Sequence, residues 1–415
     1  MTSSTSNRCQ VPFWSFLMPS SGSKTQWVTR FTQQVSKISL FVGLSVLLDV
    51  TAGIASAHAE LDLRVAIEEE VNQVRVGSST KALLRDASGQ VLAEIPAGYV
   101  VVQEQAGQVK VDRWQGRQFW IEPTENGYTF IDGKWYRGKA QVVAAVGGLT
   151  AVNHVDLEHY LYSVVGSEMP ASWPLEALKA QAVSARTYAL YQREHNANTV
   201  FDVGDTTAWQ VYKGLEEEAI STHAAVDATT GQVLTYSGRI IEAVFHSSSG
   251  GHTENVEDIW SGSRPYLRGV VDFDHSAPVY RWDETFSAAS LKQRISGVGN
   301  IISMTPEQTT PRGRIVRMRV VGDEGSRVLS GNELRRALNL KSSLFSIVPQ
   351  MGRVASAGDT IPSRPVSFRV SGRGFGHGVG MSQWGANQMA QHGNNYQQIL
   401  GHYYQNTTLS RIQVE

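Results

Sequence analysis

The sequence predicts an α+β protein that is rich in β structure, with a central mixed α/β region and a small β-rich lobe ahead of it. From Leu61 to Gly133, short apolar runs alternate with turn pairs about every ten residues, which is typical of short strands. A long helical pattern follows Pro174, and strand patterns lie on both sides of it. With 415 residues, 41% of them hydrophobic, the chain is long enough for two or three packed domains.

Residues 1–59 predict a signal for export behind a long polar leader. The apolar run 38–48 follows Arg30 and Lys37 and leads to small residues, after which we expect cleavage at Ala59. The alternative is an uncleaved anchor helix. Asp49 interrupts the apolar run, which is shorter than the roughly 20 residues that a membrane span needs.

Charge and cysteine content exclude several classes of partner and site. The net charge is −1, and the cations of residues 1–59 leave the remainder more acidic still, which does not favour binding to nucleic acid. Cys9 is the only cysteine and lies in the leader. The mature chain is therefore expected to have no disulfide and no thiolate metal ligand.

Three segments follow the predicted leader: a β-rich lobe at 60–135, a core at 136–260 and a C-terminal lobe at 261–415. Strands are expected at 141–155, 311–321 and 367–370, and a surface loop at 358–365. A hairpin is expected from 232–236 and 239–246 around Ser237-Gly238. A short helix at 331–338 is expected, with Ser330 or Asn332 as its cap.

Glu168 is the first candidate functional residue, because it lies in an apolar turn before a predicted helix. Pro174 suits a helix start. An apolar stripe on that helix is formed by residues 175, 178, 182, 185 and 189, and Lys179 and Arg186 share another face. Apolar surroundings raise a carboxyl pKa, which suits a general acid. The alternative is that Glu168 caps the helix or pairs with Lys179 or Arg186.

A second candidate is the histidine segment, residues 245–254, in which an apolar strand leads into a loop of small residues. Its histidines, hydroxyls and backbone N–H groups can bind a polar ligand, and the alternative is an ordinary Ser/Gly turn. A serine hydrolase is not indicated, because the G-x-S-x-G motif is absent. His246 and His252 are not accompanied by an H-E-x-x-H motif, so no metal is expected.

A third candidate is the glycine segment, residues 372–380, which has glycine at every second position. If it is extended, one face is bare backbone that a ligand or another strand can approach, and the other carries His377. Its spacing does not match a nucleotide-binding loop, and a purely structural role is the alternative. Gln383 lies at its end as a possible ligand-binding group, Ser382 is expected to cap the next helix, and Gly393 to end it.

Together these motifs resemble the SpoIID/LytB family, the sporulation stage II protein D and amidase-enhancer group that acts on bacterial cell wall. The most specific stretch runs from Ser167-Glu168-Met169-Pro170 to Ala185-Arg186-Thr187-Tyr188-Ala189. The resemblance covers about 270 residues and includes both other segments together with 136–138, 259–262, 266–267 and 399–404.

The resemblance implies a lytic transglycosylase that cuts the glycan strands of peptidoglycan, with Glu168 as its catalytic acid and base. The C6 hydroxyl of N-acetylmuramic acid attacks its own C1, so no second carboxylate is needed. The resemblance further implies that substrate-binding residues are Lys179, Arg186, Tyr188, His246, Ser248 and His377, with Trp173 as a further aromatic surface. Because this chain lacks the cysteines of the zinc-binding members, no metal or other cofactor is expected.

Two other functions are compatible with the same motifs. One is a non-catalytic amidase enhancer that binds the wall or an N-acetylmuramoyl-L-alanine amidase, and the other is a secreted scaffold that only holds glycan. All three place the chain in the periplasm or on the cell-wall side of the cytoplasmic membrane, anchored there if the signal is not cleaved.

Overall fold

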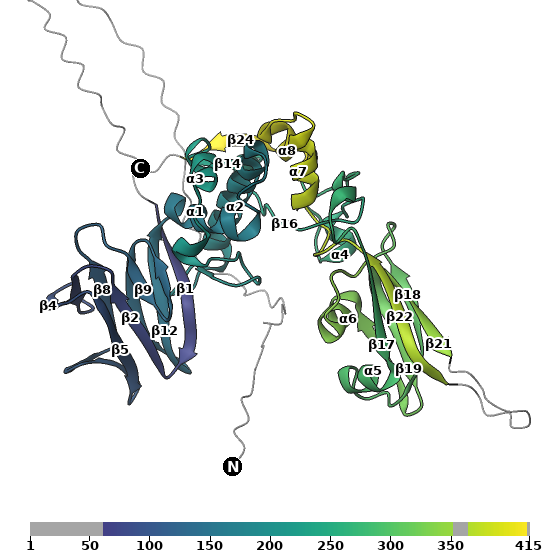
Figure 1. Ribbon diagram of the computed structural model, residues 1–415, viewed down its shortest axis with the longest axis horizontal. Helices are drawn as coiled ribbons and strands as arrows, with labels where there is room; N and C mark the ends of the chain where they lie inside the picture. The colour runs from purple at the N-terminus through teal and green to yellow at the C-terminus, as the bar shows by residue number, and fades with distance from the viewer. Residues whose placement is uncertain (1–60, 352–363, 413–415) are drawn as a thin grey trace, which may run out of the picture. The chain divides into compact units, whose positions relative to one another are not determined.

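The structure, a computed structural model, describes residues 61–351 and 364–412. It confirms the predicted α+β class, since several β-sheets are combined with eight α-helices in these residues (Figure 1). The predicted export signal at 1–59, with Cys9, lies outside the described residues, as does most of the loop predicted at 358–365. In the ranges that are described, every helix is too short or too polar to span a bilayer.

Two antiparallel sheets form the N-terminal β structure. The seven-stranded sheet contains, in spatial order, β13 (Val203–Gly204), β1 (Asp62–Val71), β12 (Gly148–Asp156), β11 (Lys139–Ala145), β8 (Gln118–Pro123), β3 (Ala82–Arg85) and β4 (Val91–Ile95), with only the short β13 parallel to its neighbour. The six-stranded sheet contains β10 (Lys134–Tyr136), β9 (Thr129–Ile131), β2 (Gln73–Ser78), β5 (Gly98–Gln105), β6 (Gln108–Val111) and β7 (Trp114–Gly116). Because β11 and β12 belong to the first sheet, the β structure continues past residue 135, where the sequence placed the end of the lobe.

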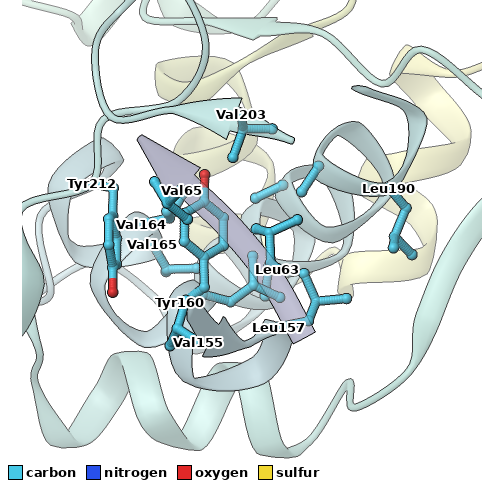
Figure 2. Packing of buried hydrophobic residues seen from close by; sticks show 14 of the residues in the cluster. Leu63, Val65, Val155, Leu157, Tyr160, Val164, Val165, Leu190, Val203 and Tyr212 are labelled. Carbon is cyan, nitrogen blue, oxygen red and sulfur yellow. The ribbon is translucent and has the colours of Figure 1, made fainter. Parts of the chain in front are cut away.

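Three helices, α1 (Leu157–Glu168), α2 (Leu175–Asn196) and α3 (Ile220–Asp227), pack against one another (Figure 1). Helix α1 was not expected from the sequence, and it begins where the Asp156 carboxylate accepts hydrogen bonds from two backbone N–H groups of the first turn. Buried side chains of α1, among them Tyr160 and Val164, share a core with Leu63 and Val65 of β1 (Figure 2). Helix α2 begins directly after Pro174, as predicted.

The central hairpin forms, but its second strand is shorter than expected. Strand β14 (Gln232–Tyr236) pairs with β15 (Arg239–Ile240) and with β24 (Thr408–Arg411). Ser237 and Gly238 both have positive φ, as the tight turn between the first two strands requires. The following β16 (Phe245–His246) leaves this sheet and pairs in parallel with β23 (Met381–Ser382).

A second hydrophobic core lies within residues 281–373. Two three-stranded sheets surround it, one of β17 (Arg281–Ser287), β22 (Pro365–Arg373) and β21 (Phe345–Met351), the other of β18 (Ile301–Thr309), β19 (Ile315–Gly322) and β20 (Gly325–Ser330). Helices α5 (Ala288–Arg294) and α6 (Gly331–Leu338) complete it, and Ser330 caps α6 as predicted. The remaining helical elements are α4 (Val256–Ile259), α7 (Gln383–Gln391), α8 (Tyr396–Tyr403) and the 3₁₀ turns η1 (Gly214–Glu217) and η2 (Asp274–Ser276).

After β22 the chain returns to the first core. Helices α7 and α8 pack on α2 (Figure 1), and their buried residues Ala386, Met389, Ile399 and Leu400 belong to the same cluster as α1 and α2. The C-terminal segment predicted at 261–415 therefore contributes to two separate cores.

Helix α2 is enclosed on more faces than its apolar stripe predicted. Arg186 is fully buried, donates a 2.7 Å hydrogen bond from Nε to Glu158 of α1, and donates another to the backbone oxygen of Gln232. Leu175, the first residue of the predicted stripe, is by contrast 42% exposed. The ion pair between Arg186 and Glu158 thus joins α2 to α1 in the interior.

We predict that Arg186→Met lowers the free energy of unfolding by about 3 kcal/mol, because Glu158 is left without its buried partner. The matched control is Lys179→Met, since Lys179 pairs with Glu176 at a partly exposed site on the same helix and is expected to cost at most about 1 kcal/mol. Urea unfolding monitored by circular dichroism measures both. Equal losses in the two variants would contradict the structural role given to Arg186.

Candidate active site around Glu168

The sequence predicted Glu168 in a turn ahead of a helix. In the structure Glu168 is instead the last residue of α1, six residues before Pro174, which directly precedes α2. Its Oε1 accepts a 3.1 Å hydrogen bond from the backbone N–H of Val211, and its Oε2 accepts a 3.1 Å bond from the side-chain amide of Gln383. Lys179 and Arg186 pair with other carboxylates. The alternative of an ion pair between Glu168 and either cation is therefore wrong.

Burial raises the pKa of the Glu168 carboxyl above its ordinary value. The Val211 N–H, the Gln383 amide and, more weakly, the charge of Lys213 act in the opposite direction, but desolvation is the larger effect. The C-terminal position in α1 acts in the same direction as burial, since the helix dipole is negative there. The site therefore keeps a larger protonated fraction of this carboxyl near neutral pH than water does.

The histidine and glycine segments are brought together by the parallel pair β16 and β23. Phe245 pairs with Met381 and His246 with Ser382, and further along Ser248 forms a bridge with Phe375. The Ser382 hydroxyl then accepts from the backbone N–H of Gly385 and caps α7, as predicted. Gln383 is consequently the first residue of α7, which places its amide at Glu168.

The glycine segment is not one extended strand. Strand β22 ends at Arg373, and the glycines at 374, 376, 378 and 380 all have positive φ. The close approach expected of this segment does occur: a Cβ on Gly380 would lie 2.1 Å from the backbone oxygen of Val244, and one on Gly376 would lie 2.6 Å from the Cβ of His246. Glycine is needed here both for conformation and for space.

The two histidines bind backbone groups between the same segments. His377 donates from Nε2 to the Phe245 oxygen and accepts at Nδ1 from the Val379 N–H, which assigns it as a neutral tautomer. Burial lowers the pKa of His377 to about 3 and that of His246 well below its usual range. His246 Nδ1 lies 3.1 Å from the Val379 oxygen, and its Nε2 has no hydrogen-bond partner among the described residues.

The structure brings some of the predicted site residues together and separates others. Tyr188 is half-buried, and its pKa is raised by burial, by the charge of Glu242 and, more weakly, by that of Glu168. Trp173 makes an edge contact with Trp384, with ring centroids 4.8 Å apart. Ser248 is fully buried and donates to Asp274, and Arg186 is enclosed with Glu158, so neither side chain is exposed to a ligand in this structure.

Lys179 is held by Glu176 at a distance of 2.7 Å rather than facing Glu168. No three histidine, cysteine, aspartate or glutamate side chains cluster as metal ligands within residues 61–351 and 364–412.

Sequence reasoning missed three contributors to the site. The Val211 N–H and Lys213 belong to a polar stretch after β13 whose only sequence signal is the aromatic pair Trp209 and Tyr212 among polar residues. Arg314 reaches the histidine segment from the second core, donating a 2.7 Å hydrogen bond to the Ser249 oxygen. It is fully buried and lies 3.5 Å from Glu254.

Comparison with known proteins places this site in a family context. A family model described as "Stage II sporulation protein" matches residues 145–236, and one described as a domain of unknown function matches 264–380. Stage II sporulation protein D of Bacillus subtilis is 37% identical over 283 residues, covering 63% of this chain and 76% of that protein.

Two further relatives show similar identity. An uncharacterized protein of Brachyspira hyodysenteriae is 34% identical over 292 residues, covering 68% of this chain and 73% of that protein. The amidase enhancer of Bacillus subtilis is 33% identical over 293 residues, covering 60% of this chain and 40% of that protein.

We predict that the free energy of unfolding of Glu168→Gln, minus that of the wild type, increases as pH rises. A carboxyl whose pKa is raised by folding releases its proton more readily in the unfolded chain, so its contribution to stability is complete below the unfolded pKa and is lost as pH rises toward the folded pKa. Glutamine does not titrate. Urea unfolding from about pH 4 to pH 8 should show the variant gaining stability relative to the wild type. A value of variant minus wild type that stays constant or decreases with pH would contradict the raised pKa.

We predict that Gly380→Ala destabilises the protein more than Gly393→Ala. Both glycines have positive φ, so each substitution costs about 1–2 kcal/mol for the backbone conformation. Only Gly380 also faces a backbone oxygen within 2.1 Å, whereas nothing lies within 4 Å of a Cβ on Gly393. Thermal unfolding should place Gly380→Ala about 1–3 kcal/mol below its control, and equal losses would contradict the close approach.

Proposed function

The chain belongs to the SpoIID/LytB family, and on this premise we propose that it remodels bacterial cell wall by cutting the glycan strands of peptidoglycan as a lytic transglycosylase. The observation that carries the proposal is the Glu168 carboxyl, which is desolvated, has a raised pKa and is held by two amide donors. The apolar run and small residues of 1–59 support export to the wall side of the membrane as part of the same proposal.

The reaction proceeds in two proton transfers through Glu168. The protonated carboxyl donates to the glycosidic oxygen of N-acetylglucosamine as the bond from that oxygen to C1 of N-acetylmuramic acid breaks. The C6 hydroxyl of the same muramic acid attacks C1, and the Glu168 carboxylate takes the proton of that hydroxyl. The products are a 1,6-anhydromuramic acid end and a free hydroxyl on N-acetylglucosamine, and Glu168 is again protonated.

The surroundings of Glu168 suit these two proton transfers. Hydrolytic glycosidases ordinarily use two carboxylates, of which one activates water or acts as the nucleophile. An internal hydroxyl as nucleophile removes that requirement, and the groups that act on Glu168 in this structure are two amide donors and Lys213. The aromatic pair Trp173 and Trp384 lies five residues after Glu168 and directly after Gln383 in the chain, and it supplies ring surface on which a sugar can stack.

A second candidate function is a non-catalytic enhancer of an N-acetylmuramoyl-L-alanine amidase. The similarity to the amidase enhancer of Bacillus subtilis favours it, and the chain covers 40% of that protein. In this case the segments around Glu168 bind the cell wall or the amidase and catalyse no reaction. The two candidates differ in one measurable product, the anhydromuropeptide.

We predict that Glu168→Gln reduces release of anhydro products from glycan strands without stem peptides by about 10²- to 10⁴-fold, because the amide cannot transfer the proton. Glu176→Gln is the matched control, since Glu176 is held by Lys179 and the Tyr396 N–H and makes no contact with Glu168 in the structure. Mass spectrometry of digests by purified protein measures both, and circular dichroism checks that each variant is folded.

Equal activity in Glu168→Gln and the wild type would refute the assigned role. Wild-type protein that releases no anhydro product but accelerates a purified amidase would establish the enhancer instead.

A further inference from the structure

The outer face of the six-stranded sheet carries three aromatic rings in one line across the strands. Trp135 of β10 pairs with Phe130 of β9, Phe130 pairs with Gly77 of β2, and Gly77 pairs with Tyr99 of β5. These residues share one register line and point to the same face, because paired residues of an antiparallel sheet do so. We call the rings of Tyr99, Phe130 and Trp135 the aromatic row.

Gly77 is what makes the row continuous. With no side chain between them, the rings of Tyr99 and Phe130 stack with centroids 5.5 Å apart and planes at 25°. Phe130 then meets Trp135 edge to face, with centroids 5.1 Å apart and planes at 61°. A Cβ at Gly77 would lie 1.9 Å from the Gly98 oxygen, so a larger residue does not fit without a shift of the backbone.

The row faces solvent rather than the core. Tyr99 is 57% exposed and Val101, two residues further on β5, is 45% exposed, whereas Val102 of the same strand and Val76 of β2 are buried. Phe130 and Trp135 are half-buried. Exposed apolar groups that gather in one patch, unlike single ones, mark sites that interact with a ligand or partner.

One end of the row adjoins the segment that holds Glu168. The backbone oxygen of Trp135 packs against Gly214, at 2.1 Å from the position of a Cβ there, and Gly214 opens η1. Val211, whose N–H binds Glu168, lies three residues earlier in the chain. Strand β10 also contacts η1 directly. The edge strand that carries Trp135 and the segment that binds Glu168 are therefore linked through η1.

We propose that the aromatic row binds sugar units of a glycan strand whose scissile bond lies at Glu168, an inference that rests on the proposed function. A pyranose ring has faces of C–H groups that stack on aromatic rings, while its hydroxyls stay hydrated at the edges. Beside the row, Arg75 lies with Cζ 5.6 Å from the Tyr99 centroid and pairs with Asp132, so polar groups border the rings. The Arg75 guanidinium suits the lactyl carboxylate of muramic acid.

A glycan fits this surface better than a protein partner does. Stable protein interfaces bury at least about 1,000 Å² with a closed apolar centre. The row is instead a line of three rings bordered by an exposed ion pair. A line of rings that ends at the strand in contact with η1 matches a linear polymer held on one side of its scissile bond.

The competing explanation is that the rings only stabilise the sheet, since cross-strand aromatic pairs contribute about 0.2–1 kcal/mol. The test therefore uses Tyr99→Thr and Trp135→Thr, which keep a strand-compatible residue but remove the ring. Val101→Thr is the matched control, because it lies on the same strand and face as Tyr99 and makes the same type of change at a position without a ring.

Binding is measured by isothermal titration calorimetry with peptide-free glycan strands, using Glu168→Gln protein so that the ligand is not cut. We expect each ring substitution to weaken binding on the order of tenfold and the Val101 control to change it less than twofold. In active protein, the same ring substitutions should raise KM for long strands and leave cleavage of a short oligosaccharide, which does not reach the row, unchanged.

Ring variants that lose thermal stability but bind long strands like the wild type would overturn the inference and leave the row a structural feature. Ring variants that bind glycan normally but no longer stimulate or bind a purified amidase would overturn it in favour of a protein surface. The proposed function fails separately, when wild-type protein with an intact row releases no anhydro product from any strand.

Discussion

The close approach of the glycine segment to the histidine segment is the constraint on which the rest of the site depends. Four glycines here have positive φ, and three of them, Gly374, Gly376 and Gly380, let the chain after β22 lie against residues 244–250 at distances that no side chain permits. That contact creates the parallel pair of β16 and β23, and Ser382 at its end starts α7. Gln383 reaches Glu168 only because these steps fix where α7 begins.

The contacts that hold these segments together are neutral or internally compensated. His377 is bonded on both ring nitrogens to backbone groups, and burial keeps its pKa near 3, so it carries no charge at physiological pH. Arg314 is the charged group among these contacts, and burial lowers its pKa to about 10. Glu254 and the Ser249 oxygen compensate its charge. This buried cation links the second core to the histidine segment, so the contact between them depends on the packing of each.

Local rules predicted the local parts of this structure and missed its tertiary contacts. The α6 boundaries, the caps Ser330 and Ser382 and the start of α2 depend on neighbouring residues, so the sequence is sufficient for them. The sequence indicated Glu168 as a candidate, but its hydrogen-bond partners lie 43 and 215 residues away, beyond the reach of spacing arguments. Arg186 shares a helix face with Lys179, yet α1 encloses it, because packing rather than periodicity decides which faces are buried.

The choice of partners around Glu168 has a chemical consequence. A cation in direct contact would lower the pKa of the carboxyl and hold it in the charged form, which can accept a proton but rarely donates one. Amide donors stabilise the charge less and remain usable when the carboxyl is neutral, because each oxygen keeps a lone pair toward its donor. The same two bonds therefore orient Glu168 in both protonation states. The proposed reaction uses one residue first as acid and then as base, which suits this kind of environment, and the pairing of Lys179 and Arg186 with other carboxylates preserves it.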